Sequence, residues 1–375
     1  MAPPPPELID DAIAEIILRL PPEEPQYLFR ASLVCKPWRR LLTDAAFLRR
    51  YRRFHRTPPL LGLFFIVYRR GEDPLPRFIP TTLPSPFPNP MLNCRSWVSR
   101  DCRHGRVLFQ NMESRKFIVW NPITGHRKEL DLPRIPYESF SVAVLCAVPG
   151  CDHGDCHAGP FLVVWACNDV VHIDSLEGSA HACVYSSQVG SWGMSVSVPI
   201  DVYDFVNMRS HGALARDCVY FMLGSGMGSR ILKYNLDKHC LCVIDPLEPC
   251  KNGIFVVPTE DGLLGVAGIK GSSLYLWSRK VNAEGVEGRM QYRTIELQTL
   301  FPDDKLLDEA IVIAFAEGVR FIFMDTSCGI SIIDLNSEDA RTLSEPEMHY
   351  AAVPFMSFYT PDCACGKLPL PAETN

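Results

Sequence analysis

The chain has 375 residues, with 37 Lys and Arg against 43 Asp and Glu, which gives a formal net charge of −6. Hydrophobic residues make up 47% and charged residues 21%, values typical of globular proteins, so disorder over most of the chain is excluded. The 32 prolines exclude a mainly helical protein, because an interior proline removes a helix hydrogen bond and clashes with the preceding turn. The acidic balance gives no reason to expect nucleic acid as a partner.

Cysteine content and the N-terminus both argue against secretion. The 15 cysteines are an odd number, so they cannot all pair within one chain. Residues 1–7 have neither the basic region nor the apolar segment of a secretion signal. The longest strongly apolar run, residues 60–68, is far shorter than the ~20 residues of a membrane helix. We therefore expect reduced thiols, no membrane partner, and a location in the cytoplasm, the nucleus or both.

Residues 7–56 have the pattern of four short helices. In the first, apolar residues recur at the three- and four-residue spacing of one helix face: Ile9, Ile13, Ile16, Ile17 and Leu20. Pro25 and Pro37 predict the starts of a second and a third helix, and Asp44 is a predicted N-cap of a fourth. Because so small a unit cannot cover every apolar face, the first helix is a candidate partner surface.

From about residue 57 the pattern changes to short predicted strands. A pair of apolar strands separated by a turn recurs along this part of the chain. The pairs are 107–109 with 117–120, 161–164 with 184–185, 219–222 with 231–234, 263–266 with 274–277, and 319–323 with 330–333. In each pair the second run is followed by a small polar residue, namely Asn121, Ser186, Asn235, Ser278 or Asp334. The spacing between successive pairs is irregular and near 50 residues, as in propeller blades with variable loops. With residues 60–68 opening a further unit, we expect five or six blades.

These observations predict an α+β multidomain protein in which a small helical domain precedes an all-β, propeller-like repeat domain. The predicted boundaries are 1–56 for the helical domain, 57–365 for the β-domain and 366–375 for a disordered tail. Residues 1–56 hold 10 basic and 7 acidic residues, whereas residues 57–375 hold 27 basic and 36 acidic residues. The sequence therefore predicts a basic helical module on an acidic β-rich domain.

One short segment has the composition of a metal site. Cys151, His153, Cys156 and His157 are four zinc-ligating residues within seven positions, and Cys363 and Cys365 would add thiolates if the C-terminus folded back. The spacing C-x-H-x2-C-H has no second ligand pair at a finger-like distance, which favours a polar surface loop between blades. We therefore assign no metal and no cofactor.

No other segment indicates catalysis. The glycines of residues 224–228 precede a strand and not a helix, so a hairpin tip is favoured over a phosphate-binding loop. The segment 36–56 holds eight basic residues and one acidic residue, Asp44. A nucleic-acid patch is one interpretation, but aromatic residues there lie at helix-core spacing, which favours a solvated face or one matched to an acidic protein. No catalytic residue is assigned.

Two N-terminal segments carry a family resemblance. Residues 8–21 (LIDDAIAEIILRLP) and 33–44 (LVCKPWRRLLTD) resemble the two halves of an F-box at the family's usual separation. Residues 47–62 resemble the large F-box families of grasses, in which a β-rich F-box-associated domain follows. Two departures are Leu8-Ile9 in place of the family's early Leu-Pro, and a longer acidic linker at residues 22–25.

This resemblance implies a substrate receptor of a Skp–cullin–F-box ubiquitin ligase, a subunit without catalytic residues. Such a receptor binds a Skp-type adaptor and, through the adaptor, cullin. Carried over by position, the resemblance implies an adaptor-binding surface that consists of Leu8, Ile9, Ile16, Leu20, Pro21, Leu28, Val34, Cys35, Trp38 and Leu41. For Trp38 a place in the module's own core is an equal alternative. An unknown target protein is expected on loops of the β-domain, with residues 150–160, 187–199 and 224–229 as candidates.

Two other hypotheses remain open at this stage. One is a metal-dependent enzyme built on the propeller, and the other is a non-proteolytic, adaptor-binding scaffold.

Overall fold

A computed structural model describes residues 10–68, 75–81, 96–154, 156–169, 177–224, 229–245, 254–259, 261–281, 287–301, 310–345 and 348–362. Within these ranges, no helix combines the length and the apolar character required to span a lipid bilayer. The predicted tail, Cys363, Cys365, and the glycines of residues 225–228 lie outside the described residues.

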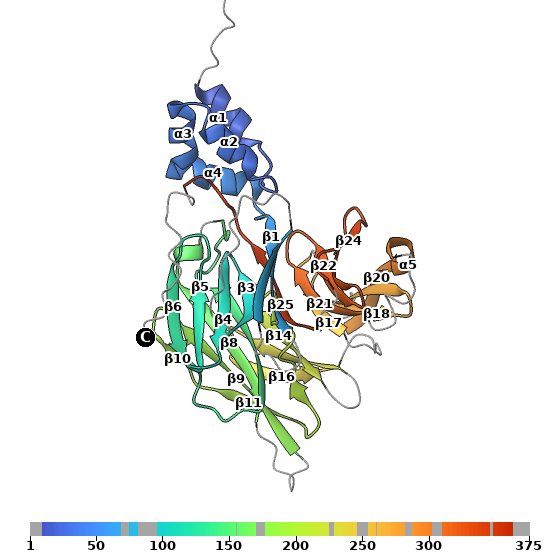
Figure 1. The fold of residues 1–375 in the computed structure, drawn as a ribbon. Coiled ribbons are helices and arrows are strands. Elements are labelled where there is room, and N and C mark those ends of the chain that lie inside the picture. Colours follow the sequence, from blue (N-terminus) through green and yellow to red (C-terminus); the bar gives the residue numbers. More distant parts are fainter. Residues whose placement is uncertain are drawn as a thin grey trace, which may run out of the picture.

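The N-terminal part of the chain is a four-helix module (Figure 1). Its helices are α1 (Asp10–Leu18), α2 (Gln26–Ser32), α3 (Lys36–Thr43) and α4 (Ala45–His55). The predicted helix starts are confirmed: Pro25 precedes α2, Pro37 lies in the first turn of α3, and Asp44 caps α4. The Asp44 carboxylate accepts a hydrogen bond from the Phe47 backbone N–H at 2.8 Å, which satisfies one of the unpaired donors at the helix start.

The rest of the described chain forms six antiparallel sheets, and a short helix, α5 (Leu297–Leu300), follows the last strand of the fifth. The first sheet contains β2 (Leu75–Pro80), β1 (Leu60–Tyr68) and β25 (Met348–Met356). The second contains β3 (Trp97–Arg103), β4 (Arg106–Asn111), β5 (Lys116–Trp120) and β6 (Arg127–Asp131). The third contains β7 (Ser139–Cys146), β8 (Phe161–Asn168), β9 (Glu177–Ser186), β10 (Ser191–Trp192) and β11 (Val196–Asp201).

The fourth sheet contains β12 (Phe205–Val206), β13 (Ala213–Ala215), β14 (Cys218–Gly224), β15 (Arg230–Asn235) and β16 (Cys240–Ile244). The fifth contains β17 (Ile254–Pro258), β18 (Leu264–Lys270), β19 (Ser273–Val281) and β20 (Glu287–Glu296). The sixth contains β21 (Ile311–Ala316), β22 (Phe321–Thr326), β23 (Gly329–Asp334) and β24 (Ala340–Thr342).

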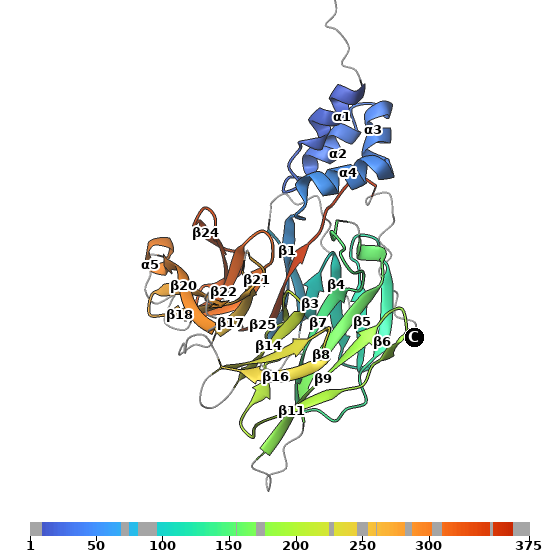
Figure 2. The same ribbon diagram turned by 180° about the vertical axis from the view of Figure 1, so that it is seen from behind.

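The six sheets are the blades of a closed propeller (Figures 1 and 2). One edge strand of each blade contacts that of the next blade, in the order β25, β3, β7, β12 and β13, β17, β21 and back to β25. The ring is closed by pairing the two ends of the domain, because β1 lies between β2 and the last strand, β25. The prediction of a propeller is thus confirmed, and the blade number is six.

Alternate residues of each blade face two different apolar cores. Val107 and Phe109 of β4 pack into the core between blades 1 and 2, whereas Leu108 packs into the core between blades 2 and 3. Phe64, on β1, contacts Phe109 and Phe355 at ring-centroid distances of 5.6 Å. Because both faces of a blade are covered by its neighbours, the strands read as continuous apolar runs and not as alternating ones.

The small polar residue that recurs after the paired runs closes a turn. Asn121 accepts hydrogen bonds from the backbone N–H groups of Ile123 and Thr124, Asn235 from that of Lys238, and Asp334 from that of Asn336. These side-chain-closed turns connect the third and fourth strands of blades 2, 4 and 6. Ser278 differs, because β19 continues past it to Val281.

A buried charged cluster ties four blades together. Arg103 of β3 donates to Asp101 Oδ2 at 2.9 Å, to the Gly212 carbonyl at 2.7 Å and to Glu317 Oε1 at 2.6 Å. Asp101 Oδ2 also accepts the backbone N–H of Val144 in β7 at 2.7 Å. Burial raises the pKa of Asp101 to about 6, and the charge of Arg103 opposes this rise.

The C-terminal segment attaches the helical module to the propeller. After β25 the chain rises beside the start of β1 and reaches the helices (Figure 1). Phe358 lies in the apolar core of the helical module, with its ring 6.2 Å from that of Tyr51. Tyr359 packs at 5.1 Å on Phe29 of α2, and Asp362 lies 4.0 Å from Arg52 of α4. Two segments of the chain therefore join the module to the propeller, namely the link from α4 to β1 and residues 357–362.

Candidate adaptor-docking surface and target groove

Several apolar side chains of the helical module are exposed. Ile16 on α1 is 54% exposed, and in the connection between α2 and α3 Leu33 is 84% and Val34 63% exposed, with Cys35 also exposed. Exposed apolar side chains gathered on a small module indicate a protein-binding surface. We call Ile16, Leu33, Val34 and Cys35, together with the half-buried residues of the next paragraph, the adaptor surface.

The remaining predicted residues divide into three groups. Leu20, Pro21, Trp38 and Leu41 are half-buried; Leu20, Trp38 and Leu41 pack on the module's core and keep part of their surface in solvent. Leu28 is 1% exposed and belongs to the core itself, so we leave it out of the adaptor surface. Leu8 and Ile9 lie outside the described residues.

Local backbone geometry explains why residues 33–35 point outward. The turn after α2 is closed by backbone hydrogen bonds from Leu33 to Arg30 and from Val34 to Ala31. Cys35 then adopts an extended conformation, and α3 begins with Pro37 in its first turn. These backbone hydrogen bonds close the turn by themselves. The side chains of Leu33 and Val34 are therefore not needed to close it. Leu33 was not among the sequence-predicted residues, although an apolar side chain just after a helix end is a usable signal.

Exposed basic residues border the adaptor surface. Arg30 of α2 and Lys36, Arg39 and Arg40 of α3 are all exposed. A positive rim around an apolar patch favours an acidic protein partner, because complementary charge speeds association and selects the orientation. This arrangement agrees with the sequence-based interpretation of the basic cluster as a face for an acidic protein.

A groove lies between blades 3 and 4. It has a volume of about 1110 Å³ and is lined by the β7–β8 loop, the β9–β11 region, and the turns that follow β13 and β15. Met194 is 95% exposed, Val189 is 76% exposed and Val148 is also exposed along it. We call this the target groove. Two of the three predicted loops, 150–160 and 187–199, contribute to it, whereas Gly224 lies at the opposite end of the β14–β15 hairpin.

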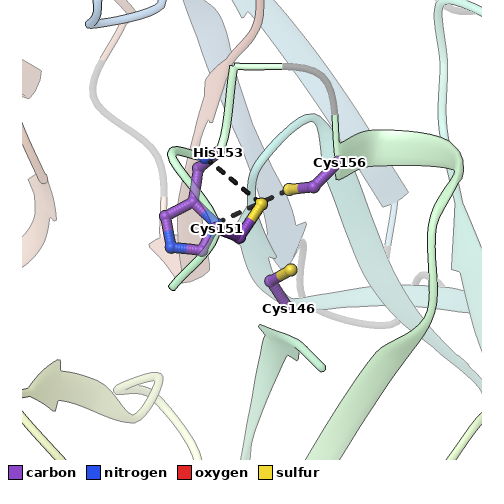
Figure 3. Close-up of side chains that lie close together, drawn as sticks. All are labelled: Cys146, Cys151, His153 and Cys156. Atoms are coloured by element: carbon purple, nitrogen blue, oxygen red, sulfur yellow. Dashed lines mark hydrogen bonds between the residues drawn. The ribbon is translucent and has the colours of Figure 1, made fainter. Parts of the chain in front are cut away.

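The segment with metal-site composition is also in this region. Cys151, His153 and Cys156 come together with Cys146, the last residue of β7, and the four ligand atoms lie within 4.8 Å of one another (Figure 3). Cys146 was missed from the sequence because it lies on a strand, five residues before the motif. His157, which the sequence analysis included, is not part of this group.

Comparison with known proteins identifies the helical module. The fold is a small helical module followed by a six-bladed propeller, and residues 6–50 match the family model of the F-box domain. No curated protein matches the chain. Among solved structures, TolB from Acinetobacter baumannii is similar at 9% identity over 83% of this chain and 73% of that chain, with a TM-score of 0.41. The acylaminoacyl peptidase of Pyrococcus horikoshii is similar at 8% identity over 76% and 50% of the two chains, with a TM-score of 0.39. Likenesses of this size say nothing about function.

Proposed function

We propose that this protein is a substrate receptor of a Skp–cullin–F-box ubiquitin ligase, as a non-catalytic subunit. The observation that carries the proposal is the F-box match at residues 6–50, on a module that exposes Ile16, Leu33 and Val34. A Skp-type adaptor would cover these side chains, and cullin would join through that adaptor. We place the protein in the cytoplasm, the nucleus or both, and the finer resemblance to grass F-box families remains part of this proposal.

The proposed mechanism is positional. The propeller holds a target protein while the assembled ligase brings a ubiquitin-charged enzyme near its lysines, and this tethering raises their effective concentration. Such a mechanism needs a fixed geometry between the two binding surfaces. The double attachment of the helical module, through the link from α4 to β1 and through Phe358 and Tyr359, supports such a geometry, and the Ser357 N–H joins the two segments by donating to the Pro59 carbonyl.

Target recruitment is assigned to the target groove. The β7–β8 loop packs toward α4 on one side, where Gly154 lies against the Cβ of Arg52, and lines the groove on the other. A target in the groove would therefore lie on the same end of the propeller as the F-box. The exposed Met194 and Val189 would supply apolar contact area to a target in the groove.

The test uses two matched pairs of surface variants. Ile16→Asp with Val34→Asp puts two charges on the adaptor surface without touching the core, because both side chains are exposed. We expect the affinity for a purified Skp-type adaptor, measured by calorimetry, to fall at least ~100-fold, since a central interface residue contributes about 2 kcal/mol or more. Trp38 is unsuitable for this test because it also packs on the module's core.

The control is Met194→Asp with Val189→Asp in the target groove. These changes should leave adaptor affinity unchanged and abolish capture of the target, identified by proximity labelling with proteasome inhibition. Unchanged adaptor affinity in the Ile16 and Val34 variant would reject the adaptor surface. Failure of the unmodified chain to bind any Skp-type adaptor would reject the proposed function itself. A target that is captured but not degraded would instead support the non-proteolytic scaffold.

A further inference from the structure

Four metal-ligating side chains meet at one point beside the propeller rim. Cys146 ends β7, Cys151 and His153 lie in the β7–β8 loop, and Cys156 begins a short 3-10 helix at Cys156–Ala158 (Figure 3). All four ligand atoms lie within 4.8 Å of one another, and Cys156 Sγ lies 3.6 Å from His153 Nδ1. We propose that these residues form a structural zinc site with three thiolates and one imidazole as ligands.

The separations fit a tetrahedral zinc ion. With Zn–S bonds of about 2.3 Å, the sulfur atoms of a tetrahedral site are roughly 3.8 Å apart, and a sulfur and a nitrogen about 3.6 Å. The distance between Cys156 and His153 already has this value, and the others need to contract by at most about 1 Å. The chain spacing is C-x4-C-x-H-x2-C, so one strand end and one loop supply every ligand.

Backbone hydrogen bonds already orient two of the sulfurs. The N–H of Val148 donates to Cys146 Sγ, and the N–H of His153 donates to Cys151 Sγ, both at 3.4 Å. In each case the donor lies two residues after the cysteine, so the loop wraps the sulfur with its own backbone. Hydrogen bonds of this kind stabilise a thiolate and fix its direction toward a metal.

The surroundings also balance the charge of such a site. Three thiolates with Zn²⁺ leave a net charge of −1. The Arg106 guanidinium lies beside the site and donates to the carbonyls of Cys156 and, at 2.9 Å, Gly159. The ring of His153 stacks on that of His104 at a centroid distance of 3.8 Å, which restricts its orientation. The nearby cation offsets the excess negative charge, and the stacking on His104 fixes the plane of the ligating imidazole.

The ligand set identifies the metal and its role. Thiolate sulfur selects zinc over magnesium or calcium, which take oxygen ligands. Four protein ligands fill the tetrahedral shell, as in structural sites, whereas catalytic zinc keeps one position for water. The proposed site therefore does not support the hypothesis of a metal-dependent enzyme.

Zinc at this position would stiffen the loop that lies between the helical module and the target groove. Without the metal, the connection 147–160 contains, among its described residues, a single short helical turn. Gly154 of this loop packs near Arg52 of α4, and Val148 lines the groove. A zinc ion that cross-links this loop to the end of β7 would fix the loop against α4 and along the target groove. The zinc proposal does not depend on the proposed function, because metal binding is measured without adaptor or target.

The test measures metal in the full chain, purified under reducing conditions from zinc-supplemented cells. Elemental analysis should give about one zinc per chain, and titration of the metal-free chain with Co²⁺ should give thiolate-to-cobalt charge transfer and the intense visible bands of tetrahedral coordination. Cys146→Ser and Cys151→Ser should each reduce the bound zinc to near zero and weaken these bands. Cys240→Ser, at an exposed cysteine of β16 outside the group, should change neither.

Three results would overturn the proposal: absence of zinc together with absence of tetrahedral Co²⁺ bands, a disulfide among the three cysteines in the reduced preparation, or full zinc content in the Cys146 and Cys151 variants. If a serine variant fails to fold, the Co²⁺ spectrum of the unmodified chain still decides between a site and none.

Discussion

Removal of the Arg103 guanidinium is the most informative perturbation of the propeller. Arg103→Leu keeps an apolar side chain at this position but deletes the donors to Asp101, Gly212 and Glu317. These partners belong to blades 2, 4 and 6, and Asp101 is also bonded to Val144 of blade 3. The variant therefore removes the bonds from blade 2 to blades 4 and 6, and it leaves Asp101, which still accepts the Val144 N–H of blade 3, without its cationic partner.

The expected cost follows from the burial of Asp101, which is 1% exposed. Breaking a buried ion pair by removing one partner destabilises a protein by about 3–5 kcal/mol, since an uncompensated charge remains inside. Glu317 contributes less, because its side chain is one-third exposed and water can solvate it. For a domain of this size we expect the melting temperature to fall by about 5–8 °C.

The loss of stability in Arg103→Leu should depend on pH, and the direction of this dependence can be worked out. Burial raises the folded-state pKa of Asp101 to about 6, above the unfolded value of about 4, so its contribution to stability is greatest below the unfolded pKa and is lost as pH rises through the folded one. Without Arg103 the folded pKa rises further. The difference in stability between variant and unmodified protein should therefore increase between pH 6 and pH 8.

The assay is thermal unfolding at pH 6 and pH 8, with Asp101→Asn/Arg103→Leu as the control. An asparagine carries no charge and still accepts the Val144 N–H, so the double variant should recover more than half of the loss. A melting temperature within about 2 °C of the unmodified protein, or a double variant no more stable than the single one, would refute the reasoning.

Two further predictions concern the helical module. Asp44→Ala removes the N-cap of α4 and should destabilise the module by about 1 kcal/mol, seen as faster hydrogen exchange in α4, whereas Asp44→Ser should restore most of the protection. Phe358→Ala removes a propeller-side residue from the module's core and should cost about 3–5 kcal/mol, raising exchange in α1, α2 and α4 while blade 4 stays protected. Equal loss of protection throughout the chain would contradict the second prediction, since Phe358 belongs to the module's core.

The sequence was most informative where a structural rule acts locally. Helix starts at Pro25, Pro37 and Asp44 could be predicted because proline and capping residues act within one turn. The central hairpins of the blades could be predicted because both of their strands are buried on two faces and are therefore apolar. The edge strands were missed because they are short or partly exposed, as with β10 and β24.

Features that depend on distant segments could not be predicted in the same way. The periodicity of α1 gives Ile16 and Ile17 the same hydrophobic character, and only packing shows that Ile17 is in the core and Ile16 is exposed. Cys146 belongs to the cluster with Cys151, His153 and Cys156 because the β7–β8 loop folds back onto the end of β7. The spacing of the motif in the sequence does not indicate this. Phe358 lies more than 300 residues from the helices that it packs against, so its role follows from closure of the propeller.

That closure also links the folding of the two ends of the chain. The four-helix module lies at the N-terminus, yet its apolar core contains Phe358, and Phe29 of α2 packs on Tyr359. The pairing of β25 with β1 places these aromatic residues, which follow β25 in the chain, beside the module. A small helical unit gains little stability from its own core, so two aromatic side chains are a large share of its burial. Part of the apolar burial that stabilises the helical module is therefore supplied by the C-terminal segment, which follows the last strand of the propeller.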